Sequence, residues 1–279
     1  MVVDDGSPDK AAEVAAQHGV CCIRQANRGV SEARNGGFRA SHGDYVVFID
    51  ADDKLLPRSI EAHLQCFAEH PNAGFVVGEI DILRGEIREE LVRRRPVLSD
   101  QYEELLKANH VANTIAVMFR RAVIETVGGF DPALSAGEDY ELLLRVARSF
   151  SGANHSTVVA LYRRHGTNVS RDGARMLRAM LSVMRAQRSF LRGNTRLKKA
   201  FRAGKAFWRD WYGGVTVKQI FIHLRNGRPL AAVKALTALL WHVRWRIALL
   251  PWKHRDRVLS VAQRGVRRLG TCLNVVRAI

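Results

Sequence analysis

The chain has 279 residues, 47% of them hydrophobic, and a formal net charge of +17, which suits one well-formed core with an appended region. Its four cysteines show no metal-ligand spacing, and the adjacent pair Cys21 and Cys22 could not easily bridge to each other, which favours a reduced, intracellular chain over a disulfide-stapled secreted one. Because it lacks a signal-peptide start and any window of about 18 uncharged apolar residues, we expect it to be neither exported nor membrane-spanning.

Helical and extended patterns alternate along the first part of the chain. Val2 and Val3 are typical of a strand end, and Ser7-Pro8 marks the start of a helix at 9–18. The pattern then predicts a strand at 20–23, a helix at 31–41, a strand at 45–49, a helix at 57–70 and a strand at 74–82. This succession predicts an α/β fold with a mostly parallel sheet and flanking helices.

The strand at 45–49 runs into three carboxylates, Asp50, Asp52 and Asp53. We expect a buried strand that delivers these acids to its carboxyl edge, where open α/β sheets bind ligands. Charges this close raise one another's pKa unless a cation or hydrogen-bond donors offset them. A divalent metal carrying a phosphorylated ligand accounts for the cluster, and an acidic turn that is merely solvated is the alternative.

Charge is distributed unevenly along the chain. Residues 1–173 hold 20 Lys and Arg against 25 Asp and Glu, whereas residues 174–279 hold 24 Lys and Arg against only Asp210 and Asp256. The net charge therefore changes from −5 to +22 near Gly173, where we expect a boundary between two functional units.

The second unit, 174–279, has helix-compatible stretches at 174–191, 195–211 and 229–250. Aromatic side chains are interleaved with its basic ones: Trp208, Trp211, Tyr212, Trp241, Trp245 and Trp252. The combination favours an amphipathic surface lying on an anionic membrane. The alternative is a helical cap that packs its apolar stripe on the first unit and leaves a solvated basic face.

Six motifs occur in an order that resembles the family 2 glycosyltransferases of GT-A fold, over roughly residues 2–173. They are VDDGS at 3–7, NRGVS with ARNGG at 27–37, GDY leading to FIDADD at 43–53, VGGFD at 127–131, GEDYEL at 137–142 and YRRHGTNVS at 162–170. The resemblance implies a GT-A domain at 1–173 with the mostly parallel sheet expected above, followed by a basic, mainly helical region at 174–279.

The resemblance also implies a donor site. Departure of a nucleoside diphosphate from a sugar builds negative charge, which a bound Mn²⁺ or Mg²⁺ neutralises. By resemblance, Asp52, with Asp50 or Asp53 beside it, holds that metal and the donor ribose, and His165 completes the metal site. An ordinary surface histidine is the alternative for His165.

Asp139 resembles the family's catalytic base, at the start of an expected helix at 138–148. In that role it removes the proton of an acceptor hydroxyl as the hydroxyl attacks the anomeric carbon from the face opposite the diphosphate, with inversion. The alternative is that Glu138 and Asp139 only favour a helix N-terminus through the helix dipole.

Three further residues complete the implied donor site. Asp4 and Asp5 resemble carboxylates that bind the nucleoside, and Arg34 resembles an arginine that approaches the diphosphate, although it could equally be a surface residue. Gly128 and Gly129 let the chain approach donor or acceptor, or form a simple turn.

Family members normally begin with a further strand and helix, which carry a Pro-x-Tyr-Asn-like stretch of the nucleobase pocket. Here Met1 falls in the middle of the second strand. Either the start has been assigned too late, or another chain or region supplies the missing piece, or the protein is degenerate, and we expect the first.

Together these features predict an inverting, metal-dependent glycosyltransferase acting on a glycan or lipid-linked acceptor in cell-surface polysaccharide biosynthesis. We expect it to be cytoplasmic and peripheral at the inner face of the cell membrane. The alternative is a noncatalytic nucleotide- or nucleic-acid-binding protein derived from a truncated transferase, because basic residues recognise any polyphosphate. No nucleic-acid motif accompanies the basic region, which disfavours a nucleic-acid partner.

Overall fold

The computed structural model describes residues 1–90, 100–111, 113–165 and 169–243. By its contacts the chain forms two compact units, one made of residues 1–166 with 191–201 and the other of 167–190 with 202–279. The division of the sequence into 1–173 and 174–279 stays a prediction.

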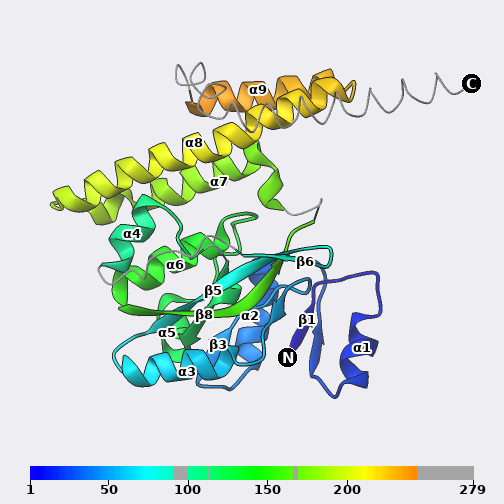
Figure 1. Ribbon diagram of the computed structural model, residues 1–279, viewed down its shortest axis with the longest axis vertical. Helices are drawn as coiled ribbons and strands as arrows, with labels where there is room; N and C mark the ends of the chain where they lie inside the picture. The colour runs from blue at the N-terminus through cyan, green and yellow to red at the C-terminus, as the bar shows by residue number, and fades with distance from the viewer. Residues whose placement is uncertain (91–99, 112, 166–168, 244–279) are drawn as a thin grey trace, which may run out of the picture. The chain divides into compact units, whose positions relative to one another are not determined.

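The chain begins with a small parallel pair of strands. β1 (Val2–Asp4) lies beside β2 (Cys22–Arg24), and α1 (Ala11–Gln17) connects them (Figure 1). α2 (Val30–Ala40) follows β2 and packs close to β1. A glycine on α2 eases this approach, because a Cβ atom at Gly37 would lie 3.0 Å from Cγ2 of Val3 and the valine side chain would have to shift.

The larger sheet is mixed, so the predicted mostly parallel sheet is wrong. Its strand order is β3-β7-β5-β8-β4, with β6 also paired to β5. The strands are β3 (Tyr45–Val47), β4 (Lys54–Leu55), β5 (Phe75–Arg84), β6 (Ile87–Glu89), β7 (Val117–Arg120) and β8 (Gly152–Arg163).

Among the described strands of this larger sheet, only β5 and β8 pair in parallel. β3 and β5 run in the same direction, as a strand–helix–strand succession predicts, but β7 is inserted between them and runs antiparallel to both. An alternating pattern predicts the direction of successive strands and not which later strand comes between them.

β3 also differs from its prediction. It ends at Val47 rather than at residue 49, and its residues are half-buried. It lies at one end of the strand order, so one of its edges has no strand neighbour in the described sheet. Phe48 is nevertheless buried, packing edge-on to the ring of Phe130 with centroids 4.8 Å apart.

Four helices accompany this sheet: α3 (Ser59–Glu69), α4 (Gln101–Lys107), α5 (Arg121–Val127) and α6 (Glu138–Ser149). A single 3₁₀ turn, η1 (Thr114–Ala116), leads into β7. The apolar face of α6 is buried, including three consecutive leucines at 142–144. This burial fixes the helix whose first turn carries Asp139.

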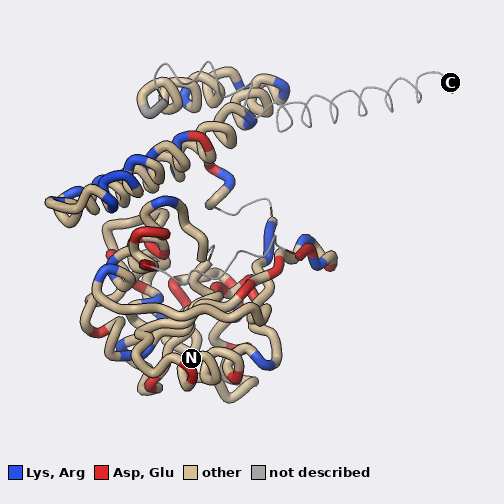
Figure 2. Tube along the Cα trace, turned by 60° about the vertical axis from the view of Figure 1, so that its left-hand side comes forward, with Lys and Arg blue, Asp and Glu red and all other residues tan. Residues whose placement is uncertain are grey.

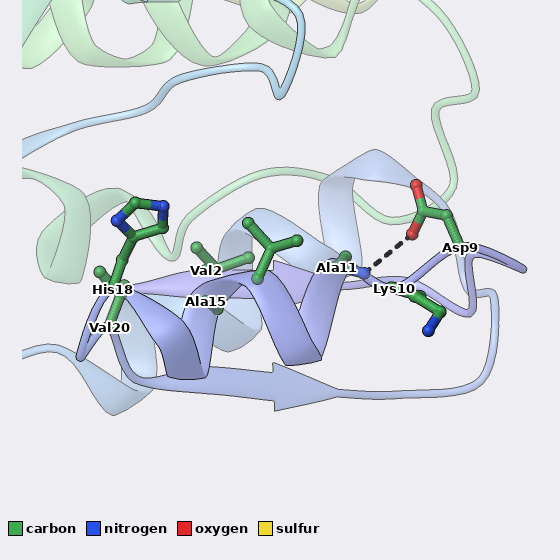
Figure 3. Close-up of a pocket in the computed structure, with 8 residues that line it drawn as sticks. Val2, Asp9, Lys10, Ala11, Ala15, His18 and Val20 are labelled. Carbon is green, nitrogen blue, oxygen red and sulfur yellow. Dashed lines mark hydrogen bonds between the residues drawn. The ribbon is translucent and has the colours of Figure 1, made fainter.

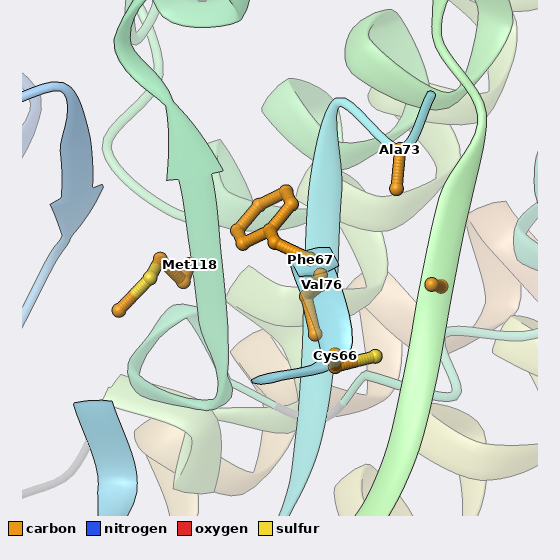
Figure 4. Close-up of a cluster of buried hydrophobic side chains, with 6 residues drawn as sticks. Cys66, Phe67, Ala73, Val76 and Met118 are labelled. Atoms are coloured by element: carbon orange, nitrogen blue, oxygen red, sulfur yellow. The ribbon is translucent and has the colours of Figure 1, made fainter. Parts of the chain in front are cut away.

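A core cluster joins α3 to three strands. It contains Cys66, Phe67, Ala73, Val76, Met118 and Ala153, with Tyr45 and Val47 of β3 packed against it (Figure 4). The neighbouring Gly152 has no room for a side chain, because a Cβ atom there would overlap the ring of Phe75. The pairing of β5 with β8 therefore depends on a glycine at the start of β8.

The second unit is helical in its described part. α7 (Gly173–Ala186) leads to the 3₁₀ segment η3 (Gln187–Leu191). α8 (Thr195–Arg225) is longer than the predicted stretch at 195–211, and α9 (Pro229–Val243) follows. The segment 191–201, which ends η3 and begins α8, belongs by its contacts to the first unit. α7 and α8 touch at Gly173, whose N–H donates to Oε1 of Gln219 at 3.0 Å. Lys and Arg greatly outnumber acidic residues on these helices (Figure 2).

The aromatic residues of this unit fall into two groups. Trp208 and Tyr212 are buried and stack on one another with centroids 5.6 Å apart, so the prediction that they belong to an exposed amphipathic surface is wrong. Trp211 and Trp241 are exposed. Trp245, Trp252 and the predicted helical continuation at 244–250 lie outside the described residues.

Candidate donor and catalytic site

The acidic cluster lies on a tight turn between β3 and β4. The N–H of Asp53 donates to the carbonyl of Asp50 at 3.0 Å, so the chain reverses within four residues. One carboxylate oxygen from each of Asp50, Asp52 and Asp53 lies within 4.8 Å of the others.

Asp53 fastens this turn to the end of β8. Its Oδ1 accepts a hydrogen bond from the N–H of Arg163 at 2.7 Å, and Nε of Arg163 donates to the carbonyl of Asp52 at 2.9 Å. Burial, reinforced by the charges of Asp52 and Asp50, raises the pKa of Asp53 to about 7. The predicted donor-binding residue Asp53 is therefore also a structural anchor.

His165 follows β8 by two residues and reaches the same turn. Its Nε2 lies 2.7 Å from Oδ2 of Asp52, and both side chains are partly exposed. The structure thus brings together two predicted metal ligands that are far apart in the sequence. The hydrogen bond from the N–H of Arg163 to the carboxylate of Asp53 holds their two segments in place.

Arg34 connects the acidic turn to α6. From α2 its Nη2 lies 2.6 Å from Asp50 and its Nη1 lies 3.1 Å from Glu138, while the side chain is only 10% exposed. Burial lowers the pKa of Arg34, but the charges of Asp50 and Glu138 outweigh it and the pKa is raised. Arg34 is therefore a buried cation between two carboxylates and not a surface residue.

Asp139 lies on the first turn of α6, after Gly137, whose φ of +77° favours glycine. Burial, with a contribution from the neighbouring charge of Glu138, raises the pKa of Asp139 to about 6, although Arg34 opposes the shift. Oδ1 of Asp139 accepts a hydrogen bond from the N–H of Tyr140 at 2.7 Å. A carboxylate with this pKa is suited to accept a proton near neutral pH.

A second link fixes α2 to the loop that precedes α6. The side-chain amide of Asn35 donates to the carbonyl of Phe130 and accepts from its N–H, both at 2.8 Å. Gly129 has a φ of +74°, and a Cβ atom there would lie 2.5 Å from Oδ1 of Asn35. The close approach that requires Gly129 is thus to Asn35, while Gly128 ends α5 in a left-handed conformation.

The carboxylates of Asp4 and Asp5 accept hydrogen bonds from Ser7 and from the segment 25–29, and not from the acidic turn. Oδ1 of Asp4 accepts from the N–H of Ser7 at 2.8 Å, and this bond chiefly lowers the pKa of Asp4. Oδ1 of Asp5 accepts from Gln25 and from the N–H of Arg28, and Oδ2 from the N–H of Gly29, each at 2.8 Å. Burial raises the pKa of Asp5, but these donors outweigh it and the pKa is lowered.

An apolar groove of about 580 Å³ lies beside β1 and α1 (Figure 3). Its walls include Val2, Val14, Ala15 and Val20, with Asp9 and Lys10 at the start of α1. None of the predicted site residues lines it, so the groove is separate from the acidic cluster.

The acidic cluster fits a hard divalent cation. Oxygen ligands are what Mg²⁺ and Mn²⁺ prefer, and an imidazole nitrogen can join them around Mn²⁺. One oxygen of Asp50 is engaged by Arg34 and one oxygen of Asp53 by Arg163. One oxygen of Asp52 also has a partner, but that partner is His165, itself a candidate ligand. Asp52 and His165 are therefore the pair best placed to bind a metal, with Asp50 as their neighbour.

Comparison with known proteins identifies the first part of the chain. Residues 1–128 match the model of Glycosyl transferase family 2. This segment is a family 2 glycosyltransferase domain. The family resemblance drawn from the motifs is thereby confirmed, while Asp139 and His165 lie beyond the matched segment.

Several curated relatives of this domain are named as glycosyltransferases. An uncharacterised glycosyltransferase of Haemophilus influenzae is 29% identical over 156 residues, covering 52% of this chain and 51% of the relative. A pre-mycofactocin glycosyltransferase of Mycobacterium tuberculosis is 28% identical over 183 residues, covering 61% of this chain and 38% of the relative. The chain thus spans about half the length of the Haemophilus relative, and less of the mycobacterial one.

Solved structures of low identity share the fold. TarS 1–349 of S. aureus, in complex with UDP-GlcNAc, aligns with a TM-score of 0.57 at 14% identity, covering 96% of this chain and 82% of TarS. The mannosyltransferase PcManGT of Pyrobaculum calidifontis, in complex with GDP-Man and Mn²⁺, aligns with a TM-score of 0.55 at 17% identity, covering 95% and 76%. The family 2 domain therefore has the α/β fold of GT-A transferases.

Sequence reasoning missed three supporting residues. Glu138 was given only a helix-dipole role, although it pairs with Arg34. Arg163 and Asn35 lie inside quoted motifs, but no role was assigned to either. For Asn35 a signal existed, because an asparagine inside a helix is unfavourable unless its amide has a specific partner.

Proposed function

We propose that the protein transfers a sugar from a nucleotide-diphosphate sugar to a hydroxyl of a glycan or lipid-linked acceptor, with inversion, in cell-surface polysaccharide biosynthesis. The observation that carries the proposal is the chain of contacts from the acidic turn through Arg34 to the start of α6. It places candidate donor ligands and a candidate base in one electrostatic network, because the charges of Arg34 and Asp50 both act on Asp139.

In this proposal the donor is held at the acidic turn. Asp52, Asp50 and His165 would hold Mn²⁺ or Mg²⁺, and the bound cation would neutralise charge on the departing diphosphate. Asp53 keeps the turn against β8, and Arg34 supplies a fixed positive charge beside the phosphates. Asp5 shapes the loop at 25–29 on the nucleoside side, and Asp4 holds the turn at Ser7 beside it.

Asp139 acts as the base. The proton of the acceptor hydroxyl passes to the carboxylate of Asp139, the hydroxyl oxygen forms a bond to the anomeric carbon, and the bond from that carbon to the diphosphate oxygen breaks. The electron pair of the broken bond leaves with the diphosphate. Its raised pKa suits Asp139 to accept this proton, because a stronger acid would be a weaker base.

We place the reaction at the cytoplasmic face of the cell membrane, with region 174–279 as the contact to an anionic surface. The +22 charge of that region supports this contact. No helix in the described ranges combines the length and apolar composition needed to cross a bilayer.

Thermal stabilisation by nucleotides tests the donor site. The protein is heated with UDP, GDP, dTDP or CMP, each with and without Mn²⁺. A ligand at about 100 times its Kd adds about 2.7 kcal/mol to the stability of the folded state. We expect one nucleotide to stabilise the protein in a Mn²⁺-dependent manner, and Asp52→Ala to abolish the effect.

Asp44→Ala is the matched control, since Asp44 is an exposed aspartate outside the cluster, and it should leave the stabilisation unchanged. Turnover of the matching nucleotide-sugar should be lost in Asp139→Asn while nucleotide binding persists. Stabilisation by a nucleotide that is the same with and without Mn²⁺ and persists in Asp52→Ala, with no turnover of any donor, would instead support the noncatalytic alternative.

A further inference from the structure

α9 has two faces of different environment. One is buried within the second unit and contains Ala232, Ala235 and Leu239. The other is exposed and also apolar: it carries Leu230, Val233, Leu236, Leu240 and Trp241. Leu230 and Trp241 are the most exposed large hydrophobic residues in the described part of the chain, at 79% and 81%.

The spacing of these residues makes the exposed set one continuous stripe. At about 100° of rotation per residue, positions 230, 233, 236, 240 and 241 fall on one side of the helix and positions 232, 235 and 239 on the opposite side. Lys234 is the one Lys, Arg, Asp or Glu of α9 and lies at the margin of the stripe. Contiguous exposed apolar surface of this kind marks an interaction site.

The charge around α9 indicates the partner. The described part of the second unit, 169–190 with 202–243, contains 12 Lys and Arg and only Asp172 and Asp210 as acids. Arg225 and Arg228 immediately precede α9. Such an excess repels a second copy of the same surface and attracts an anionic one.

We propose that the α9 stripe, defined as Leu230, Val233, Leu236, Leu240 and Trp241, inserts into the interface of an anionic lipid membrane, with α9 parallel to the surface. The aliphatic side chains enter the acyl boundary, Trp241 sits at headgroup depth, and the basic residues meet lipid phosphates. This inference deepens the proposed membrane contact and does not rest on sugar transfer.

Vesicle binding by the full chain tests the stripe. The probes are vesicles of phosphatidylcholine, with or without phosphatidylglycerol, in a sedimentation assay. We expect binding to the anionic vesicles only, weakening as salt is raised. The double variant Leu236→Gln with Leu240→Gln should bind at least about tenfold more weakly, because insertion energy scales with buried apolar area.

The matched control is Val14→Gln with Ile60→Gln, which removes two exposed apolar side chains from the first unit and should leave binding unchanged. Equal binding by the α9 variant and the unaltered protein, or no binding to anionic vesicles, overturns the proposal. The proposal is also overturned if light scattering shows that the unaltered protein is a dimer and the α9 variant a monomer, because the stripe would then bind a second copy of the chain.

A third contrary result is protection of Trp241 from acrylamide quenching without vesicles, measured as the difference from Trp241→Phe. That result would mean that other parts of the chain cover the stripe. Nucleotide stabilisation with Mn²⁺, measured on the same preparations, separates a failed membrane contact from a failed donor site.

Discussion

The paired histidines on α3 and β8 should make the stability of the first unit depend on pH below neutrality. Nδ1 of His63 lies 3.0 Å from Nε2 of His155, and the N–H of Thr157 points to Nδ1 of His155 at 3.3 Å. The proton of His155 is therefore on Nε2 and donates to His63, which leaves the proton of His63 on its buried Nε2. That Nε2 has no hydrogen-bond partner among the described residues.

A second proton on His63 would have to enter at Nδ1, facing the N–H of His155. Burial, with repulsion from His155, lowers the pKa of His63 from 6.5 to about 4. Between about pH 4 and pH 6.5 the unfolded chain binds a second proton on His63 more readily than the folded chain does. The contribution of neutral, buried His63 to the free energy of unfolding is therefore complete above pH 6.5 and is lost as the pH falls toward 4. Between pH 7.5 and pH 5 the shift corresponds to a loss of about 2 kcal/mol.

The assay is urea unfolding of the protein and of His63→Asn at pH 7.5 and pH 5. Asparagine does not titrate, and its side-chain amide can stand near the position of Nδ1. The variant starts from a lower stability at pH 7.5, but its loss between the two pH values should be about 2 kcal/mol smaller. The reasoning fails if both proteins lose the same free energy, because the pH dependence would then come from other groups.

Three further outcomes concern the candidate site. The rate constant kcat/KM should fall as the pH drops below about 6, because Asp139 must be unprotonated to act as a base; a rate that stays level to pH 5 contradicts that role. Glu138→Gln should move this acid limb to lower pH, since it removes a charge that raises the pKa of Asp139, and an unmoved limb would show that the charge is screened. Gly129→Ala should lower the stability of the fold by about 1–3 kcal/mol, through the positive φ of this position and the contact of the new Cβ atom with Asn35, as measured by thermal unfolding. Gly193→Ala is its control: that position also has a positive φ but open space around it, so its loss of stability measures the backbone strain alone.

The sequence predicted which segments form elements better than how they are ordered in space. Patterns at 57–70 and 138–148 became α3 and α6 because each has its own apolar periodicity and end signals. The insertion of β7 between β3 and β5 has no local signal, since strand order depends on long-range pairing.

The same distinction applies to the candidate site. The motifs singled out Asp52 and His165 separately, and their contact depends on the bond between Asp53 and β8, which spacing does not reveal. The tryptophans of the second unit could not be sorted from the sequence. Trp208 is buried against Tyr212, whereas Trp241 is exposed. Composition does not separate the two, because burial depends on which face of a helix packs against another element.

The bonds between Asn35 and Phe130 have a consequence for dividing this protein. A fragment cut at the end of the family match, residue 128, would keep Asn35 and Arg34 but lose Phe130 and Glu138, their partners. It would also lose β8 and so bare one edge of β5, the longest strand of the sheet apart from β8. The family match is therefore shorter than the compact unit that contains it, and an excised module has to extend at least through β8 to His165 to keep these contacts.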